Sequence, residues 1–319
     1  MKKIKLLIFT GGLLLLASCN NEEEGQGSSM QRFAPNMTAS IDGGIETKSG
    51  VIEDNANYNL GELFYWNVGD ATTLFFDSAR LDYKVSTIGL QRNKANFTTD
   101  GSLAGQSGTY DIQAYYPISA WDFDNLTVSI PAIQVQTDNT SRHLSNYMVM
   151  KGESRGVTVN NKNEVTMQYQ QLGSVLRILV LDRTTKTNVK LERIELTMMT
   201  YSNEKPFNLI GRLADKHATK LTTDDASMRV NTLELQLEGS AQDFRLKENG
   251  MKICEGYIAL FPSQPLVGVL IAKMHITADE YTKAVEVENH FSVEYDLFAF
   301  SEGFKQGYSY YLKLLLEDN

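Results

Sequence analysis

Few side chains of this sequence have the spacing that catalysis or metal binding requires. The chain has four histidines, which lie far apart and lack the spacing of zinc ligands: His143, His217, His275 and His290. Gly105-Gln106-Ser107-Gly108 is one residue short of the Gly-x-Ser-x-Gly elbow that presents a nucleophilic serine. Asp122-Phe123-Asp124-Asn125 lacks the glycine and the distal glutamate of a calcium loop, which favours a simple turn. We therefore expect no enzymatic activity, no cofactor and no metal.

Four aromatic residues suggest one other kind of chemistry, the stacking of sugar rings. They are Trp66, Tyr115, Tyr116 and Trp121. In a chain built of strands, such side chains more often pack in the core or across neighbouring strands. Core packing is the favoured interpretation, and a glycan-binding platform is the alternative.

The first residues indicate the compartment. Lys2, Lys3 and Lys5 precede or interrupt an apolar stretch over residues 4–17, which is the layout of a secretory signal peptide. The stretch is shorter than the roughly 20 apolar residues of a transmembrane helix. It ends in Leu16-Ala17-Ser18-Cys19, which resembles a lipobox. We expect residues 1–18 to be removed and Cys19 to carry a lipid that anchors the protein to a membrane.

A polar tether follows the expected lipid. Residues 19–30 contain Glu22, Glu23 and Glu24 and then a run of Gly, Gln and Ser, which cannot bury enough apolar surface to fold. An acidic patch beside a lipidated cysteine resembles the surface-export signal of Bacteroidetes lipoproteins, and plain solubilising charge is the alternative. The sequence therefore predicts an outer-membrane lipoprotein that faces the medium.

Charge and cysteine content narrow the possible partners. Removal of residues 1–18 takes away three lysines and no acid, so 27 basic and 39 acidic residues remain and the formal net charge moves from −9 to −12. Such a surface repels nucleic acid. Once Cys19 carries lipid, Cys254 is the only free cysteine left, so no intramolecular disulfide can form. A lone cysteine in an apolar run is usually a small buried hydrophobe.

The remaining sequence predicts an all-β protein. Apolar residues alternate with polar ones over Met37–Ile41 and residues 110–116, and residues 308–316 alternate in the same way. Residues 175–181 form a nearly continuous apolar run, which suits a strand buried on both faces. A cluster of Gly, Ser and Asn near residues 151–162 suggests a boundary. We predict two β-sandwich domains, over residues 31–158 and 159–319.

Several segments, in their order along the chain, resemble the fimbrillin family, the type V pilin lipoproteins of Bacteroidetes. They are Trp66-x-x-Gly69-Asp70, Ala114-Tyr115-Tyr116-Pro117, Ile130-Pro131-Ala132-Ile133-Gln134, residues 146–150 and 165–178, Leu260-Phe261-Pro262 and Phe304-x-x-Gly307-x-Ser309-Tyr310. The resemblance implies two transthyretin-like sandwiches and export as a lipoprotein. It also implies that a trypsin-like protease removes the first strand and that a donor strand of another subunit takes its place.

Two basic residues could be the processing site that the resemblance implies. Lys48, within residues 46–50, lies between the first expected strand and Trp66 and resembles the Thr-Arg site of the family. Arg32 is the second candidate, but a cut there would leave Met37–Ile41 attached. Lysine in place of arginine does not suit an arginine-specific protease.

The sequence thus predicts a structural, tip or accessory subunit of a surface pilus that supports adhesion. Its partners would be other pilin subunits and the outer membrane, with a host or bacterial surface ligand as a further partner. The alternative is a monomeric surface lipoprotein that binds a glycan or a host ligand. Residues 308–316 could be either the last strand of the fold or a donor strand, and the sequence leaves both open.

Overall fold

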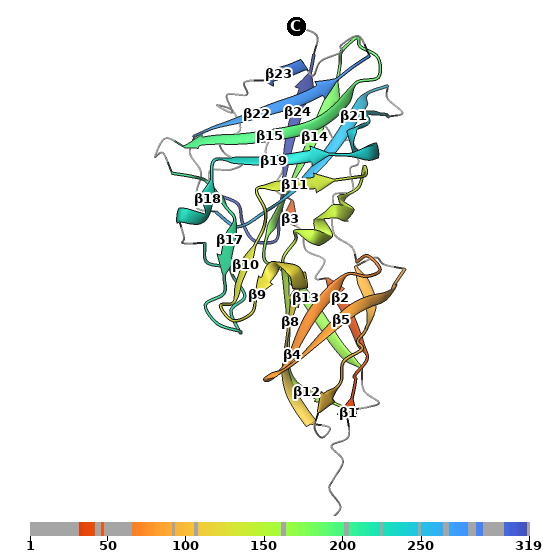
Figure 1. Ribbon diagram of the computed structural model, residues 1–319, viewed down its shortest axis with the longest axis vertical. Helices are drawn as coiled ribbons and strands as arrows, with labels where there is room; N and C mark the ends of the chain where they lie inside the picture. Colours follow the sequence, from red (N-terminus) through yellow and green to blue (C-terminus); the bar gives the residue numbers. More distant parts are fainter. Residues whose placement is uncertain are drawn as a thin grey trace, which may run out of the picture.

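The computed structural model describes residues 32–41, 46–47, 66–90, 93–104, 108–160, 164–200, 204–223, 226–247, 250–263, 268–279, 285–289 and 303–317. Almost all regular structure within these ranges is β-strand, interrupted by short 3-10 helices, so the all-β prediction is confirmed. A search of these ranges for a helix long and apolar enough to cross a membrane finds none. The molecule is elongated, with a barrel at one end and a sandwich at the other (Figure 1).

Seven strands close into the barrel. In order around it they are β12 (Met150–Val159), β13 (Val165–Gln171), β2 (Met37–Ile41), β6 (Lys94–Thr98), β5 (Ala79–Ile88), β4 (Ala71–Phe76) and β8 (Gly108–Tyr116). Their side chains alternate: Val165, Met167 and Tyr169 of β13 are buried while the residues between them are exposed. Trp66 occupies the barrel core, with its ring centroid 5.1 Å from that of Phe97.

Two five-stranded sheets form the sandwich. The strands of the first sheet are, in order, β20 (Arg245–Leu246), β21 (Lys252–Leu260), β14 (Ser174–Asp182), β24 (Tyr308–Leu316) and β3 (Glu46–Thr47). The strands of the second sheet are β11 (Ile133–Gln136), β19 (Thr232–Leu237), β15 (Lys190–Thr200), β22 (Gly268–Thr277) and β23 (Val285–Asn289). A single apolar cluster includes side chains of both sheets, so the sheets pack face to face. Every residue of β14 is buried, as the apolar run over 175–181 predicted.

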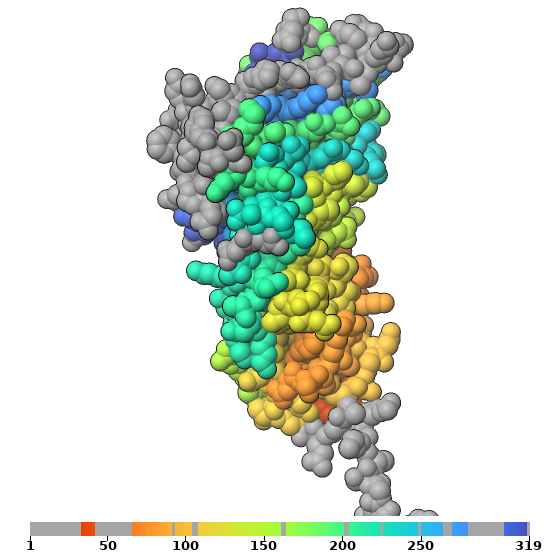
Figure 2. Space-filling view, turned by 60° about the vertical axis from the view of Figure 1, so that its left-hand side comes forward, coloured from red at the N-terminus to blue at the C-terminus, as the bar shows by residue number. Residues whose placement is uncertain are grey.

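Smaller elements connect the two units. Three small sheets complete the described strands. In the first, β1 (Arg32–Phe33) pairs with β7 (Leu103–Ala104), and in the second, β10 (Thr127–Ser129) lies between β9 (Trp121–Asp122) and β17 (Ile210–Arg212). In the third, β16 (Phe207–Asn208) pairs with β18 (Arg229–Val230). The 3-10 helices are η2 (Ile118–Ala120), η3 (Ser141–Asn146), η4 (Ala226–Met228) and η5 (Gly239–Gln242). Figure 2 shows the yellow segment that contains several of these elements lying against both the orange barrel and the green and cyan sandwich.

The chain passes between the two units more than once. β13 follows the boundary that the sequence suggested after residue 158, yet it pairs with β12 and β2 inside the barrel. β11 precedes that boundary, yet it pairs with β19 in the sandwich. Residues 151–159 of the suggested boundary belong to strand β12, so this part of the boundary lies within the barrel. How the chain divides into independent folding units stays a prediction.

Candidate strand-exchange groove

Of the first three strands of the chain, β1, β2 and β3, only β2 is part of the barrel wall. It pairs with another barrel strand on each side. Met37 to Ile41 pair in parallel with Val165 to Tyr169 of β13, while Met37 to Ser40 pair antiparallel with β6. Both neighbours come from later parts of the chain. If β2 left, the barrel would open between β13 and β6 and expose two strand edges.

The inward face of β2 fills the barrel core. Met37, Ala39 and Ile41 are at most 4% exposed, whereas Thr38 and Ser40 point outward and are partly exposed. Around them lie the buried rings of Trp66, Phe97 and other aromatic residues of the same cluster. Burial of a side chain such as Met or Ile stabilises a fold by roughly 1.5–3 kcal/mol. The space that β2 fills is therefore an apolar groove with a strand edge on either side.

Hydrogen bonds fix both ends of β2. Tyr83 on β5 donates its hydroxyl proton to the carbonyl oxygen of Pro35 at 3.0 Å, and the Val165 amide donates to the Asn36 carbonyl at 2.8 Å. At the other end, the Ile41 amide donates to the Asn93 carbonyl at 2.9 Å. Burial raises the pKa of Tyr83, so its hydroxyl keeps its proton and remains a donor.

The described N-terminal residues extend beyond the barrel. β1 pairs Arg32 with Ala104, and β3 pairs Glu46 and Thr47 in parallel with Tyr308 and Ser309 of β24. We call the described residues 32–41 and 46–47, with β1, β2 and β3, the plug segment. It contacts the barrel through β2 and the edge of the sandwich through β3. Its release would free edges in both units.

The residues predicted for lipidation and processing lie at or beyond the ends of this segment. Cys19 and Lys48 are outside the described residues. Arg32 is in β1, which precedes β2. A cut after Arg32 would therefore leave β2 covalently attached to the rest of the chain. Lys48 directly follows β3, and its two preceding residues are held by backbone pairing to β24. A protease would reach that bond more easily after this two-residue strand has detached.

The aromatic platform considered for sugars does not exist on the surface, and that alternative is wrong for these four residues. Trp66 and Tyr116 belong to the barrel core, and Tyr115 and Trp121 belong to a third apolar cluster between barrel and sandwich. All four are at most 7% exposed. The Trp121 indole donates to the Tyr116 carbonyl at 3.3 Å, so even its polar atom is used internally. Core packing is the correct interpretation.

The remaining candidates for chemistry have structural roles. His143 Nε2 lies 2.8 Å from the Tyr257 carbonyl oxygen, His217 Nδ1 lies 2.9 Å from Glu153 Oε1, and His275 Nε2 lies 2.9 Å from Glu195 Oε1. His290 is outside the described residues. Among those that the structure describes, no group of three or more His, Cys, Asp or Glu side chains could hold a metal ion.

Two further motifs have the structural roles that the sequence favoured. The Asp122 carboxylate accepts bonds from the backbone amides of Asp124 and Asn125 at 3.1 and 3.3 Å, which closes the expected turn. Cys254 is fully buried, and burial raises its pKa to about 12, so its thiol is a poor nucleophile.

Sequence patterns did not identify the residues that hold β2. Tyr83 and Asn93 are ordinary residues on or beside barrel strands, and their role depends on which strand becomes their neighbour. The alternation over Met37–Ile41 did indicate a strand, and β2 has these bounds. Its partner β13 begins more than a hundred residues later, a pairing for which a single sequence holds no local signal.

Comparison with known proteins supports the fold. No family model and no curated protein matches the chain. A candidate cell adhesion protein of Bacteroides fragilis matches over 90% of this chain and 94% of its own, with a TM-score of 0.52 and 9% identity. Another from Bacteroides uniformis matches over 90% and 93%, with a TM-score of 0.49 and 13% identity.

The solved structures that match include a fimbrial protein by name. The tip fimbrial protein Mfa3 of Porphyromonas gingivalis, solved with a C-terminal truncation, matches over 91% of this chain and 97% of its own, with a TM-score of 0.38 and 12% identity. Likeness at such identities concerns the fold alone, and the Bacteroides fragilis structure carries it. The chain thus shares its fold with a candidate cell adhesion protein of Bacteroides fragilis, and the all-β fold that the motifs imply agrees with this likeness.

Proposed function

We propose that the protein is a subunit of a surface fimbria and that its plug segment is exchanged for a strand of another subunit. A protease that cuts at Lys48 would separate the plug segment from the rest of the chain. The observation that carries the proposal is the place of β2, a short N-terminal strand that completes a barrel between two strands from later in the chain. The subunit would support adhesion at the cell surface.

The physical basis is the instability of the open barrel. Without β2, the apolar groove and the edges of β13 and β6 would meet water, and unpaired strand edges readily take up another strand. A donor strand that alternates apolar and polar residues could place its apolar side chains where Met37, Ala39 and Ile41 lie. In the precursor, the plug segment prevents this pairing. Assembly would then begin only after cleavage.

The last strand is part of this subunit's own sandwich. β24 pairs with β14 over eight residue pairs, and Tyr310, Leu314 and Leu316 are buried. In this structure residues 308–316 thus pair within their own subunit, which supports the interpretation of these residues as a strand of the fold. The proposal does not use them as the donor strand.

The N-terminal sequence supplies the anchor in this proposal. Residues 1–18 would direct export, the lipid on Cys19 would hold the precursor in the outer membrane, and residues 19–30 would place the folded part beyond it. Glu22, Glu23 and Glu24 would serve as the signal for surface exposure. Cleavage at Lys48 would also free the folded part from this anchor.

A reversible covalent lock on β2 tests the exchange directly. Hydrogen-bonded and non-hydrogen-bonded pairs alternate along the antiparallel pairing of β2 with β6. The Ile41 amide bonds to the Asn93 carbonyl, so Ile41, Ala39 and Met37 are at hydrogen-bonded positions. Thr38 and Asn96 therefore form a non-hydrogen-bonded pair. Cα atoms in such pairs are about 4.5 Å apart, which suits a disulfide. The test uses Thr38→Cys with Asn96→Cys in a Cys19→Ala background, where the remaining Cys254 is buried.

The expected result is that trypsin cuts the locked protein at Lys48 without release of the plug segment and without SDS-resistant oligomers. Addition of a reductant should then start both processes. The single variant Thr38→Cys is the control, and it should behave as the wild type does. If oligomers form equally fast with the lock closed, the groove of β2 is not the site of assembly.

The second candidate function is that of a monomeric surface protein that binds a glycan or a host ligand. The observation that favours it is a polar pocket in the sandwich, lined by no residue of the barrel. The two functions are compatible, because ligand binding at that pocket does not use the barrel.

A further inference from the structure

A pocket of about 580 Å³ lies in the sandwich, between the start of β15 and the end of β22. β14 begins at Ser174, close to the barrel strand β13, and ends at Asp182, and the turn that follows leads to Asn188 and Lys190. Asp243 and Phe244 come from the residues after η5, and Thr277 and Asp279 from the end of β22. Three segments that are distant in sequence thus form one site.

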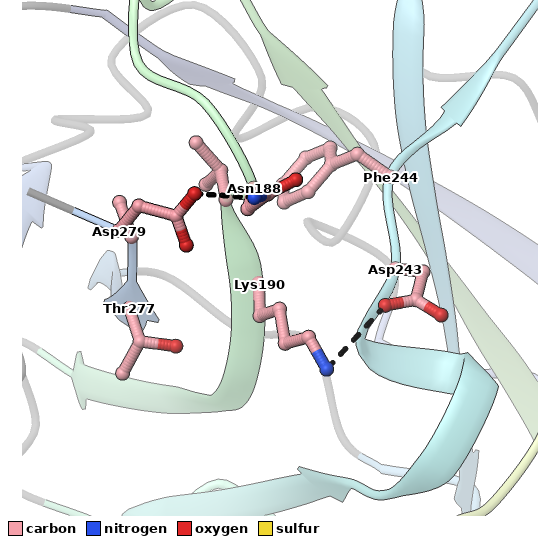
Figure 3. A pocket seen from close by; sticks show the side chains of 8 residues that line it. Asn188, Lys190, Asp243, Phe244, Thr277 and Asp279 are labelled. Atoms are coloured by element: carbon pink, nitrogen blue, oxygen red, sulfur yellow. Dashed lines mark hydrogen bonds and ion pairs between the residues drawn. The ribbon is translucent and has the colours of Figure 1, made fainter.

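The pocket combines polar walls with an apolar floor. Figure 3 shows Asp279 and Asn188 on one side, linked by a hydrogen bond from the Asn188 amide to the carboxylate, and Lys190 reaching towards Asp243 on the other. The Phe244 ring lies between them and is partly buried against the core of the sandwich. Val189 and Ala278 also line the pocket and are buried.

The polar groups of the pocket can still form hydrogen bonds with a ligand. Lys190 Nζ is 3.9 Å from Asp243 Oδ1 and both side chains are about half exposed, which describes a weak surface ion pair. A carboxylate can accept about four hydrogen bonds, so the bond from Asn188 leaves most of the acceptor sites of Asp279 available. Lys190 and Thr277 can donate, and Asp243 and Asp279 can accept.

We propose that this pocket binds an uncharged pyranose unit of a glycan. Sugar hydroxyls both donate and accept hydrogen bonds, which suits walls that carry two carboxylates, an amide, a hydroxyl and an ammonium group. The apolar C–H face of the ring would lie on Phe244, in a volume within the range of small-molecule sites. The two carboxylates against one ammonium group disfavour an anion.

The proposal is independent of strand exchange. None of the pocket residues belongs to the barrel or to the plug segment, so a subunit with β2 in place and one with a donor strand would present the same pocket. Sugar binding would therefore persist in a protein that does not assemble, and assembly would persist in a protein that does not bind sugar.

Saturation-transfer NMR on the full chain tests the proposal with the methyl glycosides of glucose, galactose, mannose and N-acetylglucosamine. At least one of them should bind. Asp243→Ala and Phe244→Leu should each weaken the affinity about tenfold, which corresponds to about 1.4 kcal/mol. Methyl glucuronide, which adds a carboxylate, should bind more weakly than methyl glucoside.

Two controls separate the pocket from general effects. Leu246→Ala changes an apolar residue that is 72% exposed and close in sequence to Phe244, and it should bind as the wild type does. Phe244→Leu keeps an apolar side chain against the core, and its melting temperature shows whether the fold is intact. Asp243→Ala removes a half-exposed carboxylate and its weak ion pair with Lys190, and its melting temperature is measured in the same way. The proposal is wrong if none of the four glycosides binds, if both pocket variants bind as the wild type does, or if the glucuronide binds best.

Discussion

The Gln134 side chain bonds to both backbone groups of Ala259: its Nε2 donates to the Ala259 carbonyl at 2.8 Å, and its Oε1 accepts from the Ala259 amide at 2.9 Å. Gln136, two residues further along β11, bonds to two different residues of β21: it accepts from the Tyr257 amide and donates to the Glu255 carbonyl. β21 pairs with β14 on one edge and, at Lys252 and Ile253, with β20 on the other; beyond β20, these side chains bond to the backbone of that second edge.

This relationship leads to the first prediction. Gln134→Leu should lower the free energy of unfolding by about 1–3 kcal/mol, because it leaves the buried amide and carbonyl of Ala259 without these bonds. Urea unfolding followed by circular dichroism measures the loss. Gln168→Leu, on the exposed face of β13, is the control and should change stability by less than about 0.5 kcal/mol. Equal effects of the two variants would contradict the role of Gln134.

The second prediction concerns pH and His143, which faces the same edge of β21. Burial lowers the pKa of His143, and its Nε2 must carry the proton that bonds to the Tyr257 carbonyl. The unfolded histidine titrates near a pKa of about 6.5, so below that pH the unfolded state gains a proton that the folded state resists. Stability should therefore fall as the pH drops below about 6.5 and be independent of this group above it.

The measurement is urea unfolding of the wild type and of His143→Gln, which can still donate to the carbonyl. The nearby charge of Asp138 opposes the effect of burial and should make the pH dependence smaller. The wild type should lose more stability than the variant between about pH 7.5 and 5. If the two curves remain parallel over that range, His143 is not responsible for any acid sensitivity.

The third prediction concerns the attachment of the plug segment. Tyr83→Phe removes the hydrogen bond to Pro35 and should make the amides of β2 exchange with deuterium faster than in the wild type. Tyr116→Phe is a matched control, because it removes a hydroxyl that donates to the Ser145 carbonyl at 2.7 Å in the same barrel. Each change should cost about 0.5–1.5 kcal/mol of global stability.

Only Tyr83→Phe should reduce the protection of β2 beyond this global loss. Hydrogen exchange measured by mass spectrometry on peptides that cover Met37–Ile41 reports the difference. Similar protection of β2 in both variants would show that the barrel core alone, without the bond to Pro35, holds the strand.

The local pattern of the sequence predicted where strands lie, but it did not predict which strands pair with each other. Met37, Ala39 and Ile41 are apolar at every second position, which indicates a strand with one buried face whatever its partners. The pairing of β2 with β13 and β6 depends on long-range closure of the barrel, and no local signal specifies it. For the same reason β13 was expected in the second domain, although it completes the barrel.

Residue type alone also cannot distinguish a core from a binding surface. Trp66 and Trp121 have the same chemistry in an aromatic platform as in an apolar core, and only their burial decides between the two. The pocket proposed for a sugar presents the opposite case, because Asn188, Asp243 and Asp279 are common surface residues. They form a site only because the turn after β14, the residues after η5 and the end of β22 meet.

The fourth prediction concerns the anchor. Cys19→Ala should abolish acyl labelling and membrane fractionation, because the thiol is the expected point of lipid attachment. Replacement of Glu22, Glu23 and Glu24 with Ala should leave lipidation intact and lower the accessibility of the protein to external protease. Membrane association of the Cys19 variant would rule out the lipid anchor, and unchanged accessibility of the triple variant would rule out the export signal.

The last prediction concerns activation at Lys48. Trypsin should cut the folded protein after Lys48, and the loss of β2 should remove the burial of Met37 and Ile41, at roughly 1.5–3 kcal/mol each. That is a substantial part of the 5–15 kcal/mol that usually stabilises a domain. The cut protein should therefore melt at a lower temperature, or form SDS-resistant oligomers as donor strands fill the groove.

Lys48→Ala should block both outcomes and leave the melting temperature of the precursor nearly unchanged, since its neighbour β3 is held by backbone pairing to β24. Arg32→Ala is the matched control: because Arg32 precedes β2, its loss should not prevent release of Met37–Ile41. Mass spectrometry of the fragments identifies the cut bond. A wild type that is cut at Lys48 without any change in melting or oligomeric state would show that β2 is retained after cleavage or is dispensable. Strand exchange would then not be the mechanism of this protein, and the monomeric ligand-binding function would be the better proposal.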